Sequence, residues 1–247
     1  MNISVVLPIY NEDKIISATI REVLNRLPKY VQKYEILAVD DGSTDKTAQI
    51  LSTLSRKHTS IRVITHSPNK GYGAALQSGI QKAKYSWIFF MDSDLQFDVH
   101  DIKSLIDVAE RNDLIVGYRK DRADHARRIY MSHIYNTFVR FLFPLPVRDV
   151  DCAFKLMRKS TLLEIGTLSN SFFVSSELMI KAALSGARIL ELPVKHLPRP
   201  AGYSKVTPIQ ILKTVLDLGR IYLATLVTRI LPMKSSYAPV LWSEHVE

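Results

Sequence analysis

The sequence has one cysteine, Cys152, and no long apolar run. A single cysteine excludes an intrachain disulfide, so we expect a reducing compartment and interpret Cys152 as a small buried side chain. The longest stretch without a charged residue, 165–176, is shorter than the roughly 18 apolar residues of a membrane-spanning helix. The opening MNISVVLPIYNE has no basic segment before an apolar one, so no secretory signal is expected. The chain is therefore not expected to cross a membrane by itself.

Two common phosphate-binding motifs are also missing. No G-x-x-x-x-G-K-[ST] occurs, and NKGYGAALQSG at 69–79 does not fit G-x-G-x-x-G. We expect Gly71 and Gly73 to let a helix begin close to a sheet, with helix amides that could face an anion. No cluster of cysteine and histidine indicates zinc. P-loop, dinucleotide and zinc-binding proteins are thus disfavoured.

Acidic residues are scarce in the second half of the chain. The formal net charge is +9, and residues 117–160 carry ten lysines and arginines against four acids, whereas residues 1–100 carry twelve against ten. Such a surplus suits phosphate, nucleic acid or an anionic membrane, and charge alone does not choose among them. Because aromatic residues are not interleaved on a recognisable nucleic-acid fold, no nucleic-acid partner is expected.

The composition, 47% hydrophobic and 23% charged over 247 residues, is that of a globular chain. Strand-like and helix-like segments alternate: strands at 3–10, 35–41, 61–66, 87–91 and 113–119, and helices at 12–27, 42–58, 71–83 and 99–110. Ser43 or Thr44 is predicted to cap the second helix. This pattern predicts an α/β fold with a mostly parallel sheet, helices on both faces, and ligands beyond the carboxyl ends of the strands.

Carboxylates stand at that predicted edge. FMDSDLQFD at 90–98 places Asp92 and Asp94 directly after an apolar strand, where residues i and i+2 point the same way. They could together hold a divalent cation, or they could begin a turn, since Asp and Ser bond to nearby amides. Asp40, Asp41 and Arg119 end other strands and are expected at the same edge.

Four stretches resemble family 2 glycosyltransferases with the GT-A fold, in order and at similar spacing: VVLPIYNE (5–12), VDDGSTDKT (39–47), NKGYGAALQSGIQKA (69–83) and FMDSDLQ (90–96). Two later stretches, RDVDCAFKLMRK (148–159) and LPRPAGYSKV (197–206), resemble segments of dolichol-phosphate mannose and polyprenyl-phosphate sugar synthases. The resemblance covers about residues 3–206. It implies a GT-A domain over residues 1–206, followed by a C-terminal amphipathic helix and tail over 207–247.

The implied reaction is inverting transfer of a sugar from a UDP- or GDP-sugar donor to a polyprenyl or dolichyl phosphate. By the resemblance, the donor site would comprise Pro8, Tyr10, Glu12, Val39, Asp41, Asp92, Ser93, Asp94 and Gln96. Of these, Asp92, Asp94 and Gln96 would hold Mg²⁺ or Mn²⁺. The acceptor phosphate would bind to Arg119, Arg128 and Ser132, and Arg199 and Lys205 would close over the phosphates. Asp94, Arg199 and Lys205 are the implied catalytic set.

The chain departs from the resembled pattern at three positions. Tyr118 stands where a small residue is usual, Asp151 where threonine or serine is usual, and Ala153 where glycine is usual. These departures bear on the sugar or the polyprenyl length more than on the reaction. A lipid phosphate is already an oxyanion at pH 7, so it needs no general base. Glu177 is accordingly expected to be structural or to contact the sugar.

The segment 207–231, if helical, has Lys213, Asp217 and Arg220 on one stripe and apolar residues around much of the rest. It could lie on a membrane interface, or pack on the catalytic core or a second subunit. Peripheral contact with the cytoplasmic face of a membrane is expected, and a homo-oligomer is possible. Two other functions remain open: a glycosyltransferase acting on a hydroxyl, and a non-catalytic sugar-nucleotide-binding protein. No Q-x-x-R-W motif supports a processive synthase.

Overall fold

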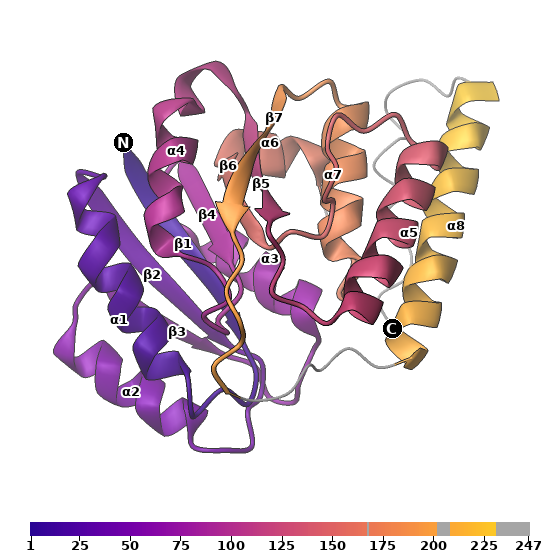
Figure 1. The fold of residues 1–247 in the computed structure, drawn as a ribbon. Helices are drawn as coiled ribbons and strands as arrows, with labels where there is room; N and C mark the ends of the chain where they lie inside the picture. The colour runs from indigo at the N-terminus through magenta and orange to yellow at the C-terminus, as the bar shows by residue number, and fades with distance from the viewer. Residues whose placement is uncertain (167, 202–207, 231–247) are drawn as a thin grey trace.

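The structure, a computed structural model, describes residues 1–166, 168–201 and 208–230. A seven-stranded sheet with the order β3-β2-β1-β4-β6-β5-β7 forms its centre (Figure 1). The strands are β1 Asn2–Ile9, β2 Lys33–Asp40, β3 Ile61–Thr65, β4 Trp87–Met91, β5 Leu114–Lys120, β6 Phe154–Arg158 and β7 Ile189–Lys195. The α-helices are α1 Ile16–Arg26, α2 Thr47–Lys57, α3 Tyr72–Lys82, α4 Ile102–Asp107, α5 Ala126–Leu142, α6 Lys159–Ile165, α7 Val174–Leu184 and α8 Pro208–Ile230. The predicted α/β class is confirmed.

The central strands are buried on both faces, which explains their continuous apolar sequences. β1 pairs in parallel with β2 and β4, so that Val5 lies between Ile36 and Phe89. Helix α3 packs on β1 and β2. Its approach requires Gly79, because a Cβ there would lie 2.3 Å from Cγ1 of Val6. The carboxyl ends of β1, β2 and β4 therefore meet at one edge of a rigid core.

One strand runs against the others. β6 pairs antiparallel with both β4 and β5, whereas β5 and β7 pair in parallel. The alternation of strands and helices predicted a mostly parallel sheet, and β6 was not among the predicted strands. Since β6 runs the other way, the chain that enters it arrives at the edge where β4 and β5 end. Residues just before β6 and just after β4 are therefore neighbours.

Two details of the predicted helices are wrong. Helix α2 begins at Thr47, with Lys46 at the N-cap position and no side-chain cap, rather than after Ser43 or Thr44. The Asp45 carboxylate instead accepts a hydrogen bond from the Thr47 amide at 2.9 Å. The single helix expected at 99–110 is divided into two short 3₁₀ turns, Val99–Asp101 and Ala109–Arg111, on either side of α4.

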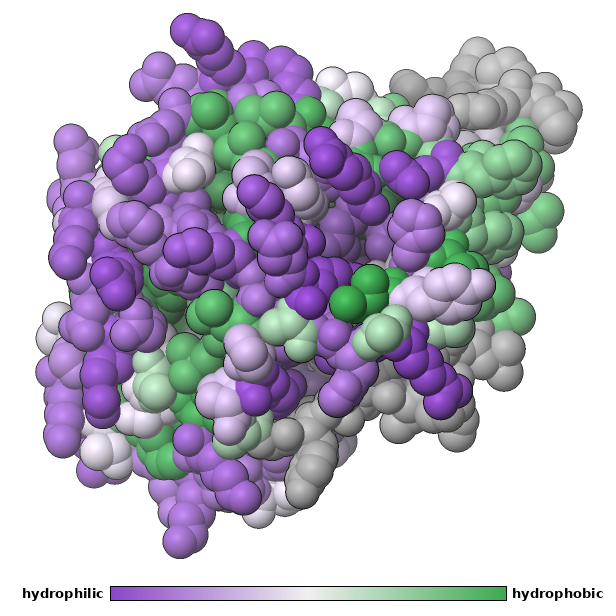
Figure 2. Space-filling model, in the orientation of Figure 1, coloured by the Kyte–Doolittle hydropathy of each residue, from purple (hydrophilic) through white to green (hydrophobic). Residues whose placement is uncertain are grey.

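Helices α5 and α8 lie side by side at one end of the molecule (Figure 1). One face of α8 packs on the chain itself, because Leu218 and Ile221 are buried and the rings of Tyr222 and Phe143 are 5.8 Å apart. Other large apolar side chains of the pair face outward: Tyr130, Met131, Ile134, Phe138 and Phe141 on α5, and Val215, Leu216 and Leu223 on α8. Figure 2 shows hydrophobic surface over α8. Among the described residues, no helix is both long and apolar enough to span a membrane.

Candidate active site

The carboxylates of Asp92 and Asp94 stand where β4 ends. Ser93 between them faces the interior: its hydroxyl donates to the Pro8 carbonyl at 3.0 Å, and its own carbonyl accepts the Thr19 hydroxyl at 2.8 Å. These two bonds anchor the turn to β1 and α1. The flanking carboxylates are left at the open edge, where Asp92 accepts the Tyr72 phenol at 2.7 Å and Asp94 accepts Arg199 at 3.2 Å.

The pKa values of Asp92 and Asp94 indicate that nearby positive charges only partly offset the negative charge of the two carboxylates. Burial raises the pKa of Asp92. Burial, and after it the neighbouring charge of Asp92, raises the pKa of Asp94 to about 7. Two buried carboxylates that share one site resist joint ionisation unless a cation lies between or beside them. A positive charge beside the pair would therefore favour the ionised form of both carboxylates.

Arg199 supplies a cation to this edge from the far end of the chain. Its guanidinium donates to Oδ2 of Asp94 at 3.2 Å and to Oε1 of Glu12 at 2.7 Å. Its Nε donates to the Ala201 carbonyl at 2.9 Å, which fixes the plane of the guanidinium. The sequence-predicted residues Glu12, Asp94 and Arg199 are thus brought together. Lys205, predicted to act with Arg199, lies outside the described residues.

The donor set fits a hard divalent cation. Carboxylate oxygens are the ligands that Mg²⁺ and Mn²⁺ prefer, and such ions commonly take their remaining ligands from substrate phosphates and water. No group of three or more metal-ligating side chains gathers within the described part of the chain. Gln96, predicted as a ligand, donates its side-chain amide to the Leu197 carbonyl at 3.3 Å. Only its amide oxygen remains available to an ion.

The other residues predicted for the donor site lie on neighbouring strands. Pro8 of β1 pairs with Val39 of β2, and the Val39 side chain is fully buried in the core. Asp41 is buried as well, and it accepts hydrogen bonds from the amides of Lys70 and Gly71 and pairs with His66 at 2.7 Å. Tyr10, at the end of β1, is half-buried. Asp41 therefore organises the loop before α3 with both of its oxygens.

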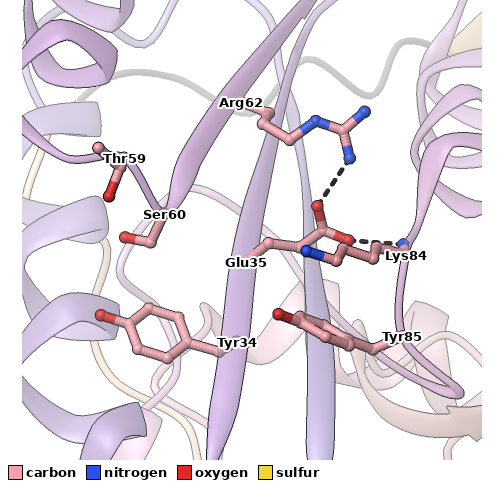
Figure 3. Close-up of a pocket in the computed structure, with 7 residues that line it drawn as sticks. All are labelled: Tyr34, Glu35, Thr59, Ser60, Arg62, Lys84 and Tyr85. Atoms are coloured by element: carbon pink, nitrogen blue, oxygen red, sulfur yellow. Dashed lines mark hydrogen bonds and ion pairs between the residues drawn. The ribbon is translucent and has the colours of Figure 1, made fainter.

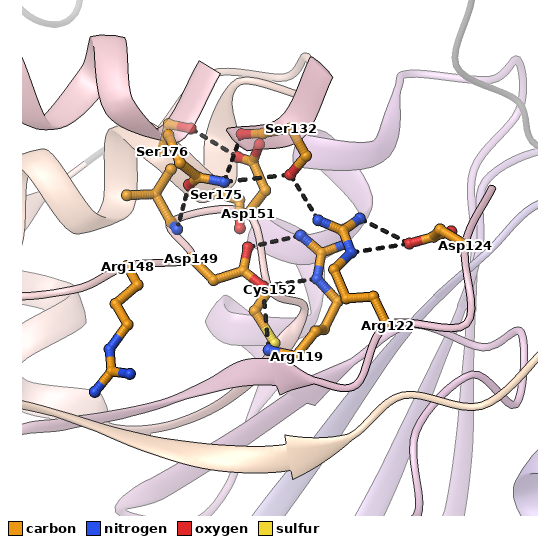
Figure 4. A network of polar contacts seen from close by, with 12 residues as sticks. Arg119, Arg122, Asp124, Ser132, Arg148, Asp149, Asp151, Cys152, Ser175 and Ser176 are labelled. Carbon is orange, nitrogen blue, oxygen red and sulfur yellow. Dashed lines mark hydrogen bonds and ion pairs between the residues drawn. The ribbon is translucent and has the colours of Figure 1, made fainter. Parts of the chain in front are cut away.

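The residues predicted for the acceptor phosphate belong to a network of paired charges, and Figure 4 shows the part of it around Arg119 and Ser132. Arg119 makes two hydrogen bonds to Asp149, at 2.6 and 2.7 Å. Arg128 pairs with Asp124 at 3.0 Å. The Ser132 hydroxyl accepts Arg122 at 2.7 Å. Arg128 and Ser132 thus come together through two residues that the sequence interpretation missed.

Arg122 connects Ser132 to Asp124, which in turn contacts Arg128. Its Nε and Nη2 donate to Oδ2 of Asp124 at 3.0 and 2.7 Å, so Asp124 contacts both Arg122 and Arg128. Burial alone would raise the pKa of Asp149, but the hydrogen bonds and charge of Arg119 hold it below its usual value. The basic run RKDRADHARR at 119–128 was the available signal for Arg122. Half of the Arg128 side chain is exposed, which leaves it the most accessible cation of this group.

A buried lysine braces the segment that enters β6. Lys155 is fully buried and donates to the carbonyls of Val150 and Cys152 and to the Ser175 hydroxyl. Burial lowers the pKa of Lys155. Asp151, in the same segment, accepts the Ser176 hydroxyl at 2.8 Å, and burial raises its pKa. These contacts hold the segment that departs from the family pattern beside the end of β4.

Both carboxylate oxygens of Glu177 are in contact with neighbouring groups. One of its oxygens accepts the Ser169 amide at 2.6 Å, and the other pairs with Lys181 at 2.9 Å. Cys152 is buried, and burial raises its pKa to about 12, which agrees with the predicted inert packing role. Neither side chain has the surroundings of an activated base or nucleophile.

A hollow of about 450 Å³ lies elsewhere, at the amino ends of β2 and β3 (Figure 3). It is lined by Tyr34, Glu35, Thr59, Ser60, Arg62, Lys84 and Tyr85. Glu35 there is held by Arg62 at 2.7 Å and by the Lys84 amide at 2.6 Å. Because ligands of such sheets bind beyond the carboxyl ends of the strands, the carboxylate edge is the better candidate for the active site.

Comparison with known proteins decides the family. Residues 4–166 match the family model "Glycosyl transferase family 2". The chain belongs to glycosyltransferase family 2. This family 2 chain is 31% identical over 224 residues to a dodecaprenyl-phosphate galacturonate synthase of Rhizobium johnstonii, covering 88% of the chain and 65% of the relative. It is 30% identical over 219 residues to an undecaprenyl-phosphate 4-deoxy-4-formamido-L-arabinose transferase of Edwardsiella ictaluri, covering 87% of the chain and 66% of the relative.

Solved structures show the same fold. A mannosyltransferase from Pyrobaculum calidifontis in complex with GDP-Man and Mn²⁺ superposes with a TM-score of 0.64 at 16% identity, covering 98% of the family 2 chain and 68% of the other. Glucosyl-3-phosphoglycerate synthase from Mycobacterium tuberculosis, solved with Mn²⁺ and UDP-glucose, gives 0.65 at 19% identity, covering 92% and 78%. The predicted GT-A fold is confirmed. The chain spans slightly less than two thirds of the two curated relatives described above.

Proposed function

We propose that this chain is an inverting, metal-dependent glycosyltransferase that moves a sugar from a nucleotide-sugar donor to a polyprenyl phosphate. The observation that carries the proposal is the convergence of Asp92, Asp94, Glu12 and Arg199 on one edge of the sheet. Family membership and the polyprenyl-phosphate relatives support the reaction and the acceptor class. Residues 1–206 are proposed as the catalytic domain, and residues 207–247 as an element that contacts a membrane interface or packs on protein.

Asp92 and Asp94 would hold Mg²⁺ or Mn²⁺, with the amide oxygen of Gln96 within the same turn. The cation would stabilise the negative charge that develops on the departing nucleoside diphosphate. Arg199 is placed to move from Asp94 onto the same phosphates, since a planar guanidinium pairs equally well with carboxylate and phosphate oxygens. Lys205 would assist as a second positive charge.

The acceptor phosphate would approach the group formed by Arg119, Arg122, Arg128 and Ser132. Asp149 holds Arg119 in place, and Asp124 holds Arg122 and Arg128. A phosphate with a second pKa near 6 is already an oxyanion at neutral pH, so the site needs to position it rather than deprotonate it. Glu177, with both oxygens in local contacts, fits a structural role in this scheme.

Peripheral contact with an anionic membrane would bring the acceptor to this group. The outward apolar side chains of α5 and α8 stand among the exposed cations Arg127, Arg140, Lys213 and Arg220. Apolar side chains mixed with basic ones are the composition of helices that bind at the lipid interface. The same helix α5 carries Arg128 and Ser132, so membrane contact and acceptor binding would be adjacent.

The test is a transfer assay with radiolabelled UDP- and GDP-sugars and with undecaprenyl or dolichyl phosphate in detergent. We expect a labelled lipid product that requires Mg²⁺ or Mn²⁺ and is lost in Asp94→Ala and in EDTA. Arg128→Ala should raise the apparent KM for the lipid phosphate much more than that for the nucleotide sugar. Equal effects on both substrates would move Arg128 to the donor site.

A hydroxyl acceptor is the second candidate, and one pair of variants separates it. With a phosphate nucleophile, Glu177→Gln should slow single-turnover transfer only modestly, whereas losing a true general base costs about 10²–10⁴-fold. Arg199→Ala should be the more damaging change, because two anionic substrates must approach each other. An inactive Glu177→Gln protein beside a nearly normal Arg199→Ala protein would favour the hydroxyl acceptor. Nucleotide-sugar binding without transfer to either acceptor would instead indicate a non-catalytic binding protein.

A further inference from the structure

The sequence Gly71-Tyr72-Gly73 at the start of α3 is fitted against a distant segment, 169–171. A Cβ on Gly71 would lie 2.5 Å from the Asn170 carbonyl oxygen, and one on Gly73 would lie 2.0 Å from the Ser169 carbonyl oxygen. The Gly73 amide donates to the Asn170 carbonyl at 2.9 Å. The two glycines were expected to let the helix approach the sheet. Instead, they leave room for the backbone of residues 169–171 to approach closely. Gly71 also has a φ of +99°, a conformation that other residues rarely adopt.

This close fit fixes the Tyr72 side chain between two phenylalanines. Its ring stacks on Phe172, with centroids 5.2 Å apart and planes 9° apart. It meets Phe90 of β4 edge to face, at 6.2 Å and 61°. Both geometries are favourable aromatic contacts, and together they leave the ring little rotational freedom. The phenol is therefore held at a defined height above the end of β4.

The phenol oxygen donates to Oδ1 of Asp92 at 2.7 Å. A phenol has one proton to donate, so it binds one carboxylate oxygen and leaves Oδ2 for another partner. Ser93 anchors the backbone of Asp92 from the other side. The direction of the Asp92 carboxylate is thus determined by contacts rather than by solvent.

We propose that Tyr72 is a positioning residue for the cation-binding carboxylate Asp92, and that Gly71, Gly73 and Phe172 hold the Tyr72 side chain in place. The proposal rests on the proposed function, in which Asp92 binds a divalent cation. Hydrogen-bond partners of metal ligands fix the ligand's orientation, and their loss commonly costs about 10–100-fold in metal affinity. The Tyr72 phenol is such a partner for Asp92, whereas the carboxylates that Arg199 contacts are those of Asp94 and Glu12.

Two substitutions distinguish the role of the Tyr72 hydroxyl from that of the residues that hold its ring in place. Tyr72→Phe keeps the ring contacts and removes only the hydrogen bond to Asp92. Gly73→Ala keeps the hydroxyl and pushes against the Ser169 carbonyl. We expect both proteins to bind Mn²⁺ about 10–100-fold more weakly than the wild type. A matched control is Tyr30→Phe, since the Tyr30 phenol contacts His100 rather than a metal carboxylate, and it should bind Mn²⁺ normally.

The experiment measures free Mn²⁺ by electron paramagnetic resonance during titration of the full chain, with and without UDP or GDP, and checks folding by thermal unfolding. Asp92→Ala tests the proposed function: if it binds Mn²⁺ as the wild type does, Asp92 is no ligand and both proposals fail there. If Asp92→Ala loses Mn²⁺ but folded Tyr72→Phe keeps the wild-type affinity, only the positioning role of Tyr72 is overturned. Should Tyr72→Phe not fold, Gly73→Ala decides, and normal affinity in it overturns the role.

Discussion

Arg199 occupies the place where a cation would meet Asp94. Because its guanidinium already contacts Asp94 and Glu12, an incoming metal ion must displace it. Arg199→Ala should therefore bind Mn²⁺ more tightly than the wild type when no nucleotide is present. A hydrogen bond to a charged group is worth about 1.5–3 kcal/mol, which corresponds to a gain of about tenfold or more. Titration monitored by paramagnetic resonance measures the change.

The control for Arg199→Ala is Arg188→Ala, which removes the same charge from a surface pair with Asp113. It should leave Mn²⁺ affinity unchanged. Tighter binding in both variants would indicate only a general effect of net charge. Unchanged binding in Arg199→Ala would show that the guanidinium does not compete with the ion.

His196 makes the stability of the fold depend on pH. It packs on Phe97, and its Nδ1 accepts the Ala123 amide, which requires a neutral ring. Burial lowers the pKa of His196 from 6.5 to about 4. Between these two values the unfolded chain binds the proton and the folded chain does not. The contribution of neutral His196 to the stability of the fold is therefore complete above pH 6.5 and is lost as pH falls toward 4.

Urea unfolding at about pH 7.5 and about pH 5 tests this dependence. The wild type should lose on the order of 1 kcal/mol from His196 over this interval, and His196→Phe should lose that much less. The exposed residue His133 provides the control, since His133→Phe should keep the wild-type dependence. Equal losses in His196→Phe and the wild type would assign the pH dependence to other groups.

The parallel half of the sheet was predictable, whereas β6 was not. Strands β1, β2 and β4 contain the apolar runs VVLPI, ILAV and WIFFM, each followed within three residues by a carboxylate, a pattern that identifies both the strand and its end. β6 has Lys155 as its second residue, and a lysine argues against a buried strand. Only the folded chain shows that carbonyls and a hydroxyl surround its ammonium group. The sequence could not supply these partners because they belong to irregular backbone and to α7.

Helices α5 and α8 should mediate binding to anionic vesicles. Phe141 on α5 is 84% exposed and Leu223 on α8 is 63% exposed. Phe141→Asp and Leu223→Asp should each weaken binding to phosphatidylglycerol vesicles by about tenfold, since each removes apolar burial and adds charge repulsion. Vesicle flotation measures the bound fraction, and high salt should weaken wild-type binding.

A matched surface change guards against a general effect of solubility. Leu163 on α6 is 65% exposed, and Leu163→Asp should bind vesicles as the wild type does. If all three variants bind alike, α5 and α8 do not form the membrane-contacting surface. If Leu163→Asp alone loses binding, a different part of the molecule contacts the lipid.

Contacts between distant parts of the chain explain why the sequence predicted the site incompletely. Asp92 and Asp94 were found from their place after a strand, and Glu12 and Arg199 from the family resemblance. The pairing of Arg199 with Glu12 joins residues 187 positions apart, so no local pattern indicates it. Tyr72 was missed because its role depends on Phe172 and on a close approach to Ser169 and Asn170. Local sequence identifies single ligands, whereas their supporting contacts depend on tertiary packing.

The molecule should be stabilised cooperatively by metal and nucleotide. A nucleoside diphosphate alone meets the negative charges of Asp92, Asp94 and Glu12, and a metal alone competes with Arg199. Bound together, the ion neutralises the carboxylates and the diphosphate can take up Arg199. Ligand at about 100 times its Kd stabilises by about 2.7 kcal/mol, or about 5–10 °C in Tm for a chain of this size. Thermal unfolding with Mn²⁺, with UDP or GDP, and with both should show a joint shift in Tm larger than the sum of the separate shifts.

Asp94→Ala should lose this excess, while Asp107→Ala, in an exposed pair with Lys103, should keep it. Purely additive shifts in the wild type would mean that the ion and the diphosphate do not share the edge where β4 ends.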